Sequence, residues 1–334
     1  MIRKIRFFIQ KNMPRFYLNL VKINCFFRKI QSGERKRSFG KLNGDKNIYV
    51  IRVRRESLGL MGYYMAILGH LRIAEKRNYI PVVDMMNYKN QYLCSDKMGV
   101  VNSWEYYFKQ TNPIISLEEA YKSKNVVLSN METPMEANPR MFYEQIYLNG
   151  HMEEYYKKIK KHFHFQPEIE KILKNNYDNI FGPIVAKGKK ILGVVCRGTD
   201  IIGFPGHSIQ ASKEELLDIV KELMEKYQCD YVFMASDTDK AIRFFEQHMG
   251  KTVVLTNDAK RYDDFSEKHA NVLSEMHFER ENDEYLKGME YLTTIYLLSK
   301  CNVLVGSLVG STIGAICMNC GAYEHVQIID KGVY

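Results

Sequence analysis

The feature that most constrains the fold is an alternation of short apolar segments with amphipathic segments between residues 190 and 329. The apolar segments have the length of strands and are rich in β-branched residues, and most of the segments between them have the period of a helix. Strands that alternate with helices in this way form a parallel sheet with right-handed crossovers. We expect strands over 190–196, 230–235, 252–255, 302–306 and 325–329, and helices over 212–227, 238–248, 283–300 and 311–319.

The first half of the chain starts with the same pattern. A strand over 47–53, a helix over 63–77 and a strand over 79–84 would form a βαβ unit, and residues 155–177 read as a charged helical region. We therefore expect an α/β fold with two facing Rossmann-like domains and mostly parallel sheets. The expected organisation is a basic amphipathic arm and linker (1–46), a first domain (47–184) and a second domain (185–334).

The positive charge of the chain is confined to its start. Residues 1–40 contain eleven Lys and Arg against one acid, Glu34, whereas the rest has 37 Lys and Arg against 38 acids. The neutral body argues against nucleic acid as a partner. The arm mixes its cations with large apolar residues, so it could lie on an anionic membrane, pack on the body as a helix, or remain a tail. The start lacks a continuous apolar core, which argues against a signal peptide. The seven cysteines lack a disulfide-framework spacing, so we expect a cytoplasmic protein.

Arg197 directly follows the apolar run 190–196. Ligands of open α/β sheets bind at the carboxyl ends of strands, and a forked, permanently charged donor at that place suits a pyrophosphate. The alternative is a surface arginine paired with Asp200 in a turn.

Two further strand ends carry polar residues. Asp237 and Asp239 follow the strand 230–235, where an Asp-x-Asp could hold a divalent cation, although Asp237 is also a good helix N-cap. The strand 302–306 leads into a small-residue turn and a helix, whose first backbone amides favour an anion. The hydroxyl and glycine residues of this turn, which could otherwise be a close-packed connection, are Ser307, Gly310, Ser311 and Thr312.

Residues 87–110 are rich in Tyr and Asn and contain the single Trp. This stretch could line a sugar site or be an ordinary packed segment.

The segments 194–200, 233–237 and 297–307, in that order, resemble the three motifs of the GDP-fucose-dependent fucosyltransferase superfamily. This superfamily includes the nodulation, core and protein O-fucosyltransferases. The stretch from about 47 to 334 is similar to a bacterial branch of surface-polysaccharide glycosyltransferases, through residues 79–85, 102–107, 280–288 and 332–334.

The resemblance implies a GT-B fold, a donor nucleotide in the C-terminal domain, and inversion at the anomeric carbon without a metal or other cofactor. Arg197 would clamp the β-phosphate, and Asp237 would support the guanosine side of the site. The phosphate-facing turn would contain Ser307, Gly310 and Ser311, with Thr312 beside them, and His207 is a further donor-binding candidate.

The chain departs from the family pattern where Val195 replaces the family histidine and Gly198 the second arginine. Thr294 also replaces an acid that precedes the third motif in the core enzymes, although Glu290 lies four residues back on the same helical face. The segment 201–207 has no carboxylate, so Glu56 becomes the candidate base, as in some protein O-fucosyltransferases. Asp200 and His207 are its rivals.

These observations lead to one hypothesis and two alternatives. The hypothesis is an inverting, metal-independent transferase that moves fucose from GDP-fucose to a bacterial surface polysaccharide or its lipid-linked precursor. It would act in the cytoplasm, with residues 1–40 on the inner membrane face. The alternatives are a metal-dependent transferase that uses Asp237 and Asp239, and a non-catalytic nucleotide- or glycan-binding protein.

Overall fold

The computed structural model describes residues 13, 32–53, 58–198, 206–263 and 276–334, and these are the residues discussed below. Its second half is built on a sheet of five parallel strands in the order β7-β6-β5-β8-β9. The strands lie where the alternation predicts them. Their bounds are β5 (Ile191–Cys196), β6 (Tyr231–Ser236), β7 (Val254–Leu255), β8 (Val303–Ser307) and β9 (His325–Ile329).

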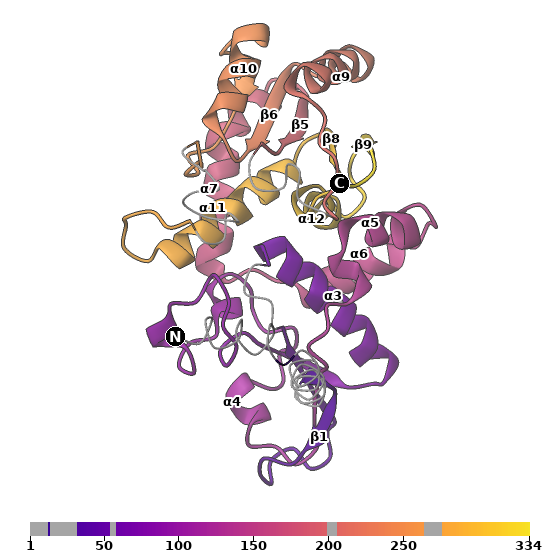
Figure 1. Cartoon of the computed structure of the whole chain (residues 1–334), viewed down its shortest axis with the longest axis vertical. Coiled ribbons are helices and arrows are strands. Elements are labelled where there is room, and N and C mark those ends of the chain that lie inside the picture. Colours follow the sequence, from indigo (N-terminus) through magenta and orange to yellow (C-terminus); the bar gives the residue numbers. More distant parts are fainter. Residues whose placement is uncertain (1–12, 14–31, 54–57, 199–205, 264–275) are drawn as a thin grey trace.

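Helices cover both faces of this sheet (Figure 1). Leu192 and Val194 of β5 pack with α9 (Lys213–Tyr227) and α10 (Asp239–Met249), whereas Ile191 and Val195 face the opposite way. That opposite face is covered by α7 (Pro167–Ile180), α11 (Asp283–Leu298) and α12 (Gly310–Asn319). Because both faces are covered, the strands are continuously apolar rather than alternating.

The first half contains a four-stranded sheet in the order β1-β4-β2-β3. The strands β2 (Ile48–Arg52), β3 (Ile80–Asp84) and β4 (Val126–Leu128) run parallel, and β1 (Arg35–Arg37) is antiparallel to β4. The long helix α3 (Leu60–Lys76) packs on one face, and the short α4 (Leu117–Ala120) packs on the other. The predicted α/β class, with two mostly parallel sheets, is thus confirmed.

Shorter elements complete the chain. They are the 3₁₀-helices η1 (Ser95–Lys97), η2 (Ser103–Tyr106) and η3 (Met135–Ala137), the α-helices α5 (Pro139–Phe142), α6 (Met152–His162) and α8 (Gly182–Val185), and the π-helix η4 (Tyr143–Tyr147). In the part of the chain that the structure describes, no helix is both long and apolar enough to cross a membrane.

The structure corrects two expectations. Within the linker expected up to residue 46, Arg35–Arg37 pairs with β4 as an edge strand of the first sheet, and Lys36 and Arg37 remain exposed. The helical region expected over 155–177 is two helices, because Pro167 cannot continue a helix and instead starts α7.

The two sheets share one apolar core. The helix α7 precedes the expected boundary at residues 184 and 185, yet Phe181 just after it contacts Phe233 of β6. The helices α3 and α12 also pack on each other, and a Cβ atom at Gly314 would lie 2.6 Å from the side chain of Met61. The packing unit of the second sheet therefore begins before the expected domain boundary, and the start of α3 reaches it.

Candidate functional site

The strand order of the second sheet places a crevice between β5 and β8. From β5 the chain moves outward in one direction to β6 and β7, whereas β8 and β9 extend the sheet in the other direction. The helices that follow β5 and β8, α9 and α12, lie on opposite faces of the sheet. Such a switch point, at the carboxyl ends of the strands, is where open α/β sheets bind ligands.

Arg197 lies at this switch point and is paired with the neighbouring strand's loop. Its Nε atom is 2.9 Å from Oδ2 of Asp237, and Oδ1 of the same carboxylate accepts the backbone N–H of Gly198 at 2.9 Å. The side chains are 21% and 7% exposed, so the pair is largely shielded from solvent. The alternative of a surface arginine paired with Asp200 is not needed to explain how Arg197 is held.

The helix-capping expectation for Asp237 is wrong. Thr238 is the N-cap of α10, and its hydroxyl accepts the N–H of Ala241. Asp263 accepts the N–H groups of Asp239 and Lys240 at the same helix start. Since these two residues satisfy the helix, the Asp237 carboxylate is left for Arg197 and Gly198.

Asp237 and Asp239 do not converge on one point. Asp239 lies 3.5 Å from Nε of Arg261, whose guanidinium also donates to the carbonyls of Ala259 and Asn257. Burial lowers the pKa of Arg261 from its usual value. In the described ranges, no group of three or more His, Cys, Asp or Glu side chains is placed to hold a metal ion.

The turn from β8 into α12 forms the other wall of the crevice. Ser307 is buried, and it lines the same small cavity as Arg197. The N-cap of α12, Val309, makes no side-chain hydrogen bond, and the first turn carries no acid. By contrast, α9 and α10 are capped by Ser212 and Thr238. The first amides of α12 are thus left without a side-chain cap, as in helix ends that bind anions.

The first turn of α12 packs closely on β5 and β8. A Cβ atom at Gly306 would lie 2.7 Å from Oγ1 of Thr312 and 2.8 Å from Cβ of Val195. The Thr312 hydroxyl is fully buried and has no hydrogen-bond partner among the residues that the structure describes. The close-packed connection and the anion-binding turn are therefore compatible interpretations of one segment.

Two tyrosines beside Arg197 were not singled out from the sequence. Tyr262 donates its backbone N–H to the carbonyl of Asp237, and burial, with help from Asp283, raises the pKa of its phenol to about 12. Burial also raises the pKa of Tyr291, while Arg197 and the adjacent Ser311 hydroxyl oppose that rise. Tyr262 lies in a loop without periodicity and Tyr291 in an ordinary helical pattern, so neither gave a sequence signal.

A salt-bridge network fixes the loop before α11. Arg280 donates to Asp283 at 2.7 Å and to both oxygens of Glu290 at 2.5 and 3.0 Å. The pKa of Arg280 is raised by its bond to Glu290. The motif around residue 280 therefore orders the loop and start of α11, and Glu290 is committed to Arg280.

His207 lies on a short ladder formed with the C-terminus. Its carbonyl accepts the N–H of Tyr334, and Ile209 donates to the carbonyl of Gly332. Next to it, the Ser208 hydroxyl donates to the carbonyl of Leu308 in the β8–α12 turn. The structure thus places His207, which is exposed, beside this turn. Glu56 and Asp200 lie outside the described residues.

Three solved structures resemble the chain at low identity. The NodZ alpha-1,6-fucosyltransferase soaked with GDP-fucose is 15% identical, with a TM-score of 0.47, over 82% of this chain and 93% of that chain. The fucosyltransferase NodZ from Bradyrhizobium is 13% identical, with a TM-score of 0.45, over 82% and 92%. POFUT1 in complex with GDP is 11% identical, with a TM-score of 0.44, over 85% and 99%. No protein-family model matches the sequence, and a comparison with curated proteins finds no relative.

Proposed function

We propose that this chain is an inverting, metal-independent glycosyltransferase that transfers fucose from GDP-fucose. The observation that carries the proposal is the position of Arg197, which Asp237 holds after β5, in the same cavity as Ser307, which precedes the uncapped start of α12. The motif resemblance supports the choice of donor, because Arg197, Asp237 and Ser307 all fall in the matching segments.

The arrangement suits departure of a nucleoside diphosphate. As the bond from the sugar to the β-phosphate breaks, negative charge develops on the leaving diphosphate. A guanidinium and helix-terminal amides that already point at that place stabilise the charge without reorganisation. Asp237 holds the guanidinium, so the cation is in place before the donor binds.

The same contacts argue against the metal-dependent alternative. A cation bound between Asp237 and Asp239 would have to displace Arg197 from one carboxylate and Arg261 from the other. In our proposal Arg197 supplies the positive charge that such a metal would supply.

Glu56 is the proposed base, with Asp200 and His207 as rivals. In the sequence Glu56 stands between Val53, at the end of β2, and the start of α3. The start of α3, which follows Glu56 in the sequence, packs on α12 at the donor side. A base there would take the proton of the acceptor hydroxyl as the hydroxyl attacks the anomeric carbon.

The acceptor in this proposal is a bacterial surface polysaccharide or its lipid-linked precursor. We place the enzyme in the cytoplasm, with the basic residues 1–40 on the inner membrane face, where a lipid-linked acceptor would be met. The eight cations of that segment that precede β1 support this placement.

The test is nucleotide binding followed by turnover. The melting temperature of the full chain is measured with GDP, UDP, GMP and guanosine, and GDP release from GDP-fucose is measured without acceptor. We expect GDP to raise the melting temperature more than GMP or guanosine does, because a ligand that binds only the folded state stabilises that state. We also expect slow hydrolysis of GDP-fucose in the absence of an acceptor. Binding of GDP without turnover would favour a non-catalytic binding protein, and no binding of any nucleoside diphosphate would contradict the proposal.

A further inference from the structure

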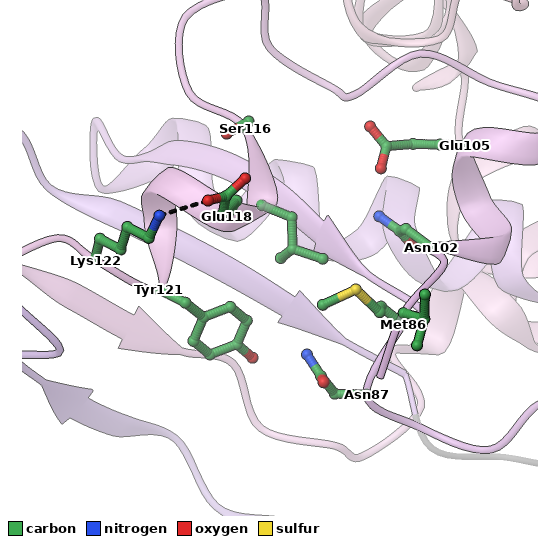
Figure 2. A pocket seen from close by; sticks show the side chains of 10 residues that line it. Met86, Asn87, Asn102, Glu105, Ser116, Glu118, Tyr121 and Lys122 are labelled. Carbon is green, nitrogen blue, oxygen red and sulfur yellow. Dashed lines mark hydrogen bonds and ion pairs between the residues drawn. The ribbon is translucent and has the colours of Figure 1, made fainter. Parts of the chain in front are cut away.

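A second hollow lies in the first half, at the carboxyl end of β3. It has a volume of about 700 Å³, within the range of small-molecule pockets. Figure 2 shows Asn102 and Glu105 on one side facing Glu118 and Tyr121 on the other. The complete lining is Met86, Asn87, Val100, Asn102, Glu105, Ser116, Leu117, Glu118, Tyr121 and Lys122.

The floor of this pocket is held by Asp84, the last residue of β3. Its carboxylate is fully buried and accepts the Tyr121 hydroxyl at 2.6 Å, together with the backbone and side-chain N–H groups of Asn87 at 3.0 Å. Burial, followed by the Asp84 charge, raises the pKa of Tyr121 far above its usual value, so the hydroxyl stays protonated. The side chains of two polar lining residues, Asn87 and Tyr121, are thus held in place before any ligand binds.

The wall opposite α4 is also rigid. Asn102 donates to the carbonyl of Val83 and accepts the N–H of Met85. The end of this wall is tied to the second half, because the Tyr107 hydroxyl donates to the carbonyl of Tyr285 and the two rings stack. Hydrogen bonds therefore hold this wall at both ends.

Two carboxylates remain available to a ligand. Glu105 is exposed and points into the pocket, and among the described residues none hydrogen-bonds to its carboxylate (Figure 2). Glu118 pairs only with Lys122, at 2.5 Å, and both side chains are largely exposed. An exposed ion pair of this kind contributes little to stability, so a ligand can compete with Lys122 for the carboxylate.

The chemistry of the lining selects among ligand classes. Two carboxylates against one lysine disfavour phosphate and other anions. Carboxylate, amide and phenol groups around the apolar Met86 and Leu117 match a ring that has hydroxyl groups on its edge and C–H groups on its face. We propose that this pocket binds one neutral sugar unit of a glycan, with Glu105 and Glu118 accepting its hydroxyl groups.

The position of the pocket connects it with the donor site. The strands β2 and β3 are parallel, with Arg52 opposite Asp84, so both strands end at the same edge of the first sheet. The pocket lies at this edge. The strand β2 also ends there and is followed in the sequence by α3, which packs on α12. The identification of the bound glycan as the acceptor rests on the proposed function. The sugar-binding property itself does not.

The experiment measures binding and not turnover. The full chain is titrated with methyl glycosides of glucose, galactose, mannose, N-acetylglucosamine, fucose and rhamnose, by calorimetry and saturation-transfer NMR, with glucuronate and inorganic phosphate as anionic probes. The variants are Glu105→Gln and Glu118→Gln. The control is Glu168→Gln, which removes an exposed carboxylate from α7, away from the pocket. All these sites are exposed, and circular dichroism verifies folding.

We expect at least one neutral glycoside to bind the wild type and the control equally. We expect each pocket variant to bind it about tenfold more weakly, because a hydrogen bond to a charged group is replaced by a neutral one. The proposal is overturned if no glycoside binds, if both pocket variants bind like the wild type, or if glucuronate or phosphate binds better. GDP binding by the same preparation tests the donor site separately, so a chain that binds GDP but no sugar overturns only this inference.

Discussion

The guanidinium of Arg197 and the carboxylate of Asp237 form a pair between adjacent parallel strands, with 2.9 Å between Nε and Oδ2. The register sets this distance, because Cys196 and Ser236, the last residues of β5 and β6, lie opposite each other. The residues that follow them therefore leave the sheet together. Asp237 positions Arg197 through the sheet and not through a flexible loop.

Replacing Asp237 with Asn should impair the donor site without unfolding the protein. The variant keeps an oxygen for the Gly198 N–H but loses the charge that holds Arg197. A charge-assisted hydrogen bond contributes about 1.5–3 kcal/mol, so we expect catalytic efficiency with GDP-fucose to fall by about one to two orders of magnitude. The matched control is Asp230→Asn, because Asp230 pairs with Lys189 at the opposite end of the same strands. Equal losses in both variants would show a general structural effect.

Stability should fall in mild acid because of His70. This imidazole is buried on α3 beside the Tyr49 hydroxyl, and burial lowers its pKa from 6.5 to about 4. The unfolded chain therefore binds a proton at a higher pH than the folded chain does. The contribution of His70 to the free energy of unfolding is fully present above about pH 6.5 and is lost as the pH falls toward about 4, by at most about 1.4 kcal/mol per pH unit.

Urea unfolding at several pH values between 4 and 7 measures this dependence. His70→Gln removes the titrating group, so its stability should change less steeply with pH than that of the wild type, whatever its absolute stability. Parallel curves for the two proteins would contradict the assignment to His70.

The sequence was sufficient to predict the second sheet because its strands are buried on both faces. Continuous apolar runs such as Ile191–Cys196 leave few alternatives to a buried strand. The strand β1 could not be found in this way, since Arg35–Arg37 has no apolar residue and is a strand only because β4 lies beside it. Tertiary pairing, and not local propensity, determines that segment.

The candidate site was predictable in part for a related reason. Strand ends reveal Arg197 and Ser307, because parallel strands bring their carboxyl ends to one edge. The role of Asp237 depends on which residues accept the first backbone N–H groups of α10. Thr238 and Asp263 accept them. Asp263 lies 24 positions after Asp239 in the sequence, so no local pattern could reveal this contact. The pocket between Glu105 and Glu118 likewise forms only when α4 folds against β3.

Turnover should survive removal of metal ions. Arg197 and Arg261 already neutralise Asp237 and Asp239, so a divalent cation has no unpaired carboxylate there to bind. GDP-fucose hydrolysis is measured after dialysis against EDTA and again after magnesium or manganese is added. We expect equal rates. Loss of turnover that either cation restores would favour the metal-dependent alternative.

Removing residues 1–31 should release the protein from anionic membranes while leaving its fold intact. The cut falls before β1, which pairs with β4 and must be kept. Each basic residue near an anionic surface contributes about 1 kcal/mol, and salt screens the attraction. We expect the full chain to sediment with phosphatidylserine vesicles at low salt, and the truncated chain to remain in the supernatant with its hydrolysis rate unchanged. Vesicles of neutral phosphatidylcholine are the control, and equal sedimentation of both proteins would show that the arm is not the attachment.

Arg197 itself provides the most direct test of the proposed function. It is the one cation at the crevice that shares a cavity with Ser307 among the described residues, and its neighbour Gly198 offers no second guanidinium. Removal of a charged donor that faces the developing negative charge raises the activation free energy by about 3 kcal/mol, which lowers the rate by about two orders of magnitude. Arg197→Ala should lose at least this much and should weaken GDP binding more than guanosine binding, because guanosine has no phosphate.

Arg197→Lys distinguishes charge from geometry at the same position. Lysine keeps the charge but lacks the planar fork, so it cannot hold Asp237 through one edge and present a fixed pair of donors to a phosphate. We therefore expect it to remain badly impaired, although less so than alanine. Arg243→Ala is the matched control, since Arg243 is an exposed arginine on α10, 3.8 Å from Asp263. If folded Arg197→Ala, verified by circular dichroism and melting, turns over GDP-fucose like the control, the diphosphate is bound elsewhere and the switch point of the second sheet is not the donor site.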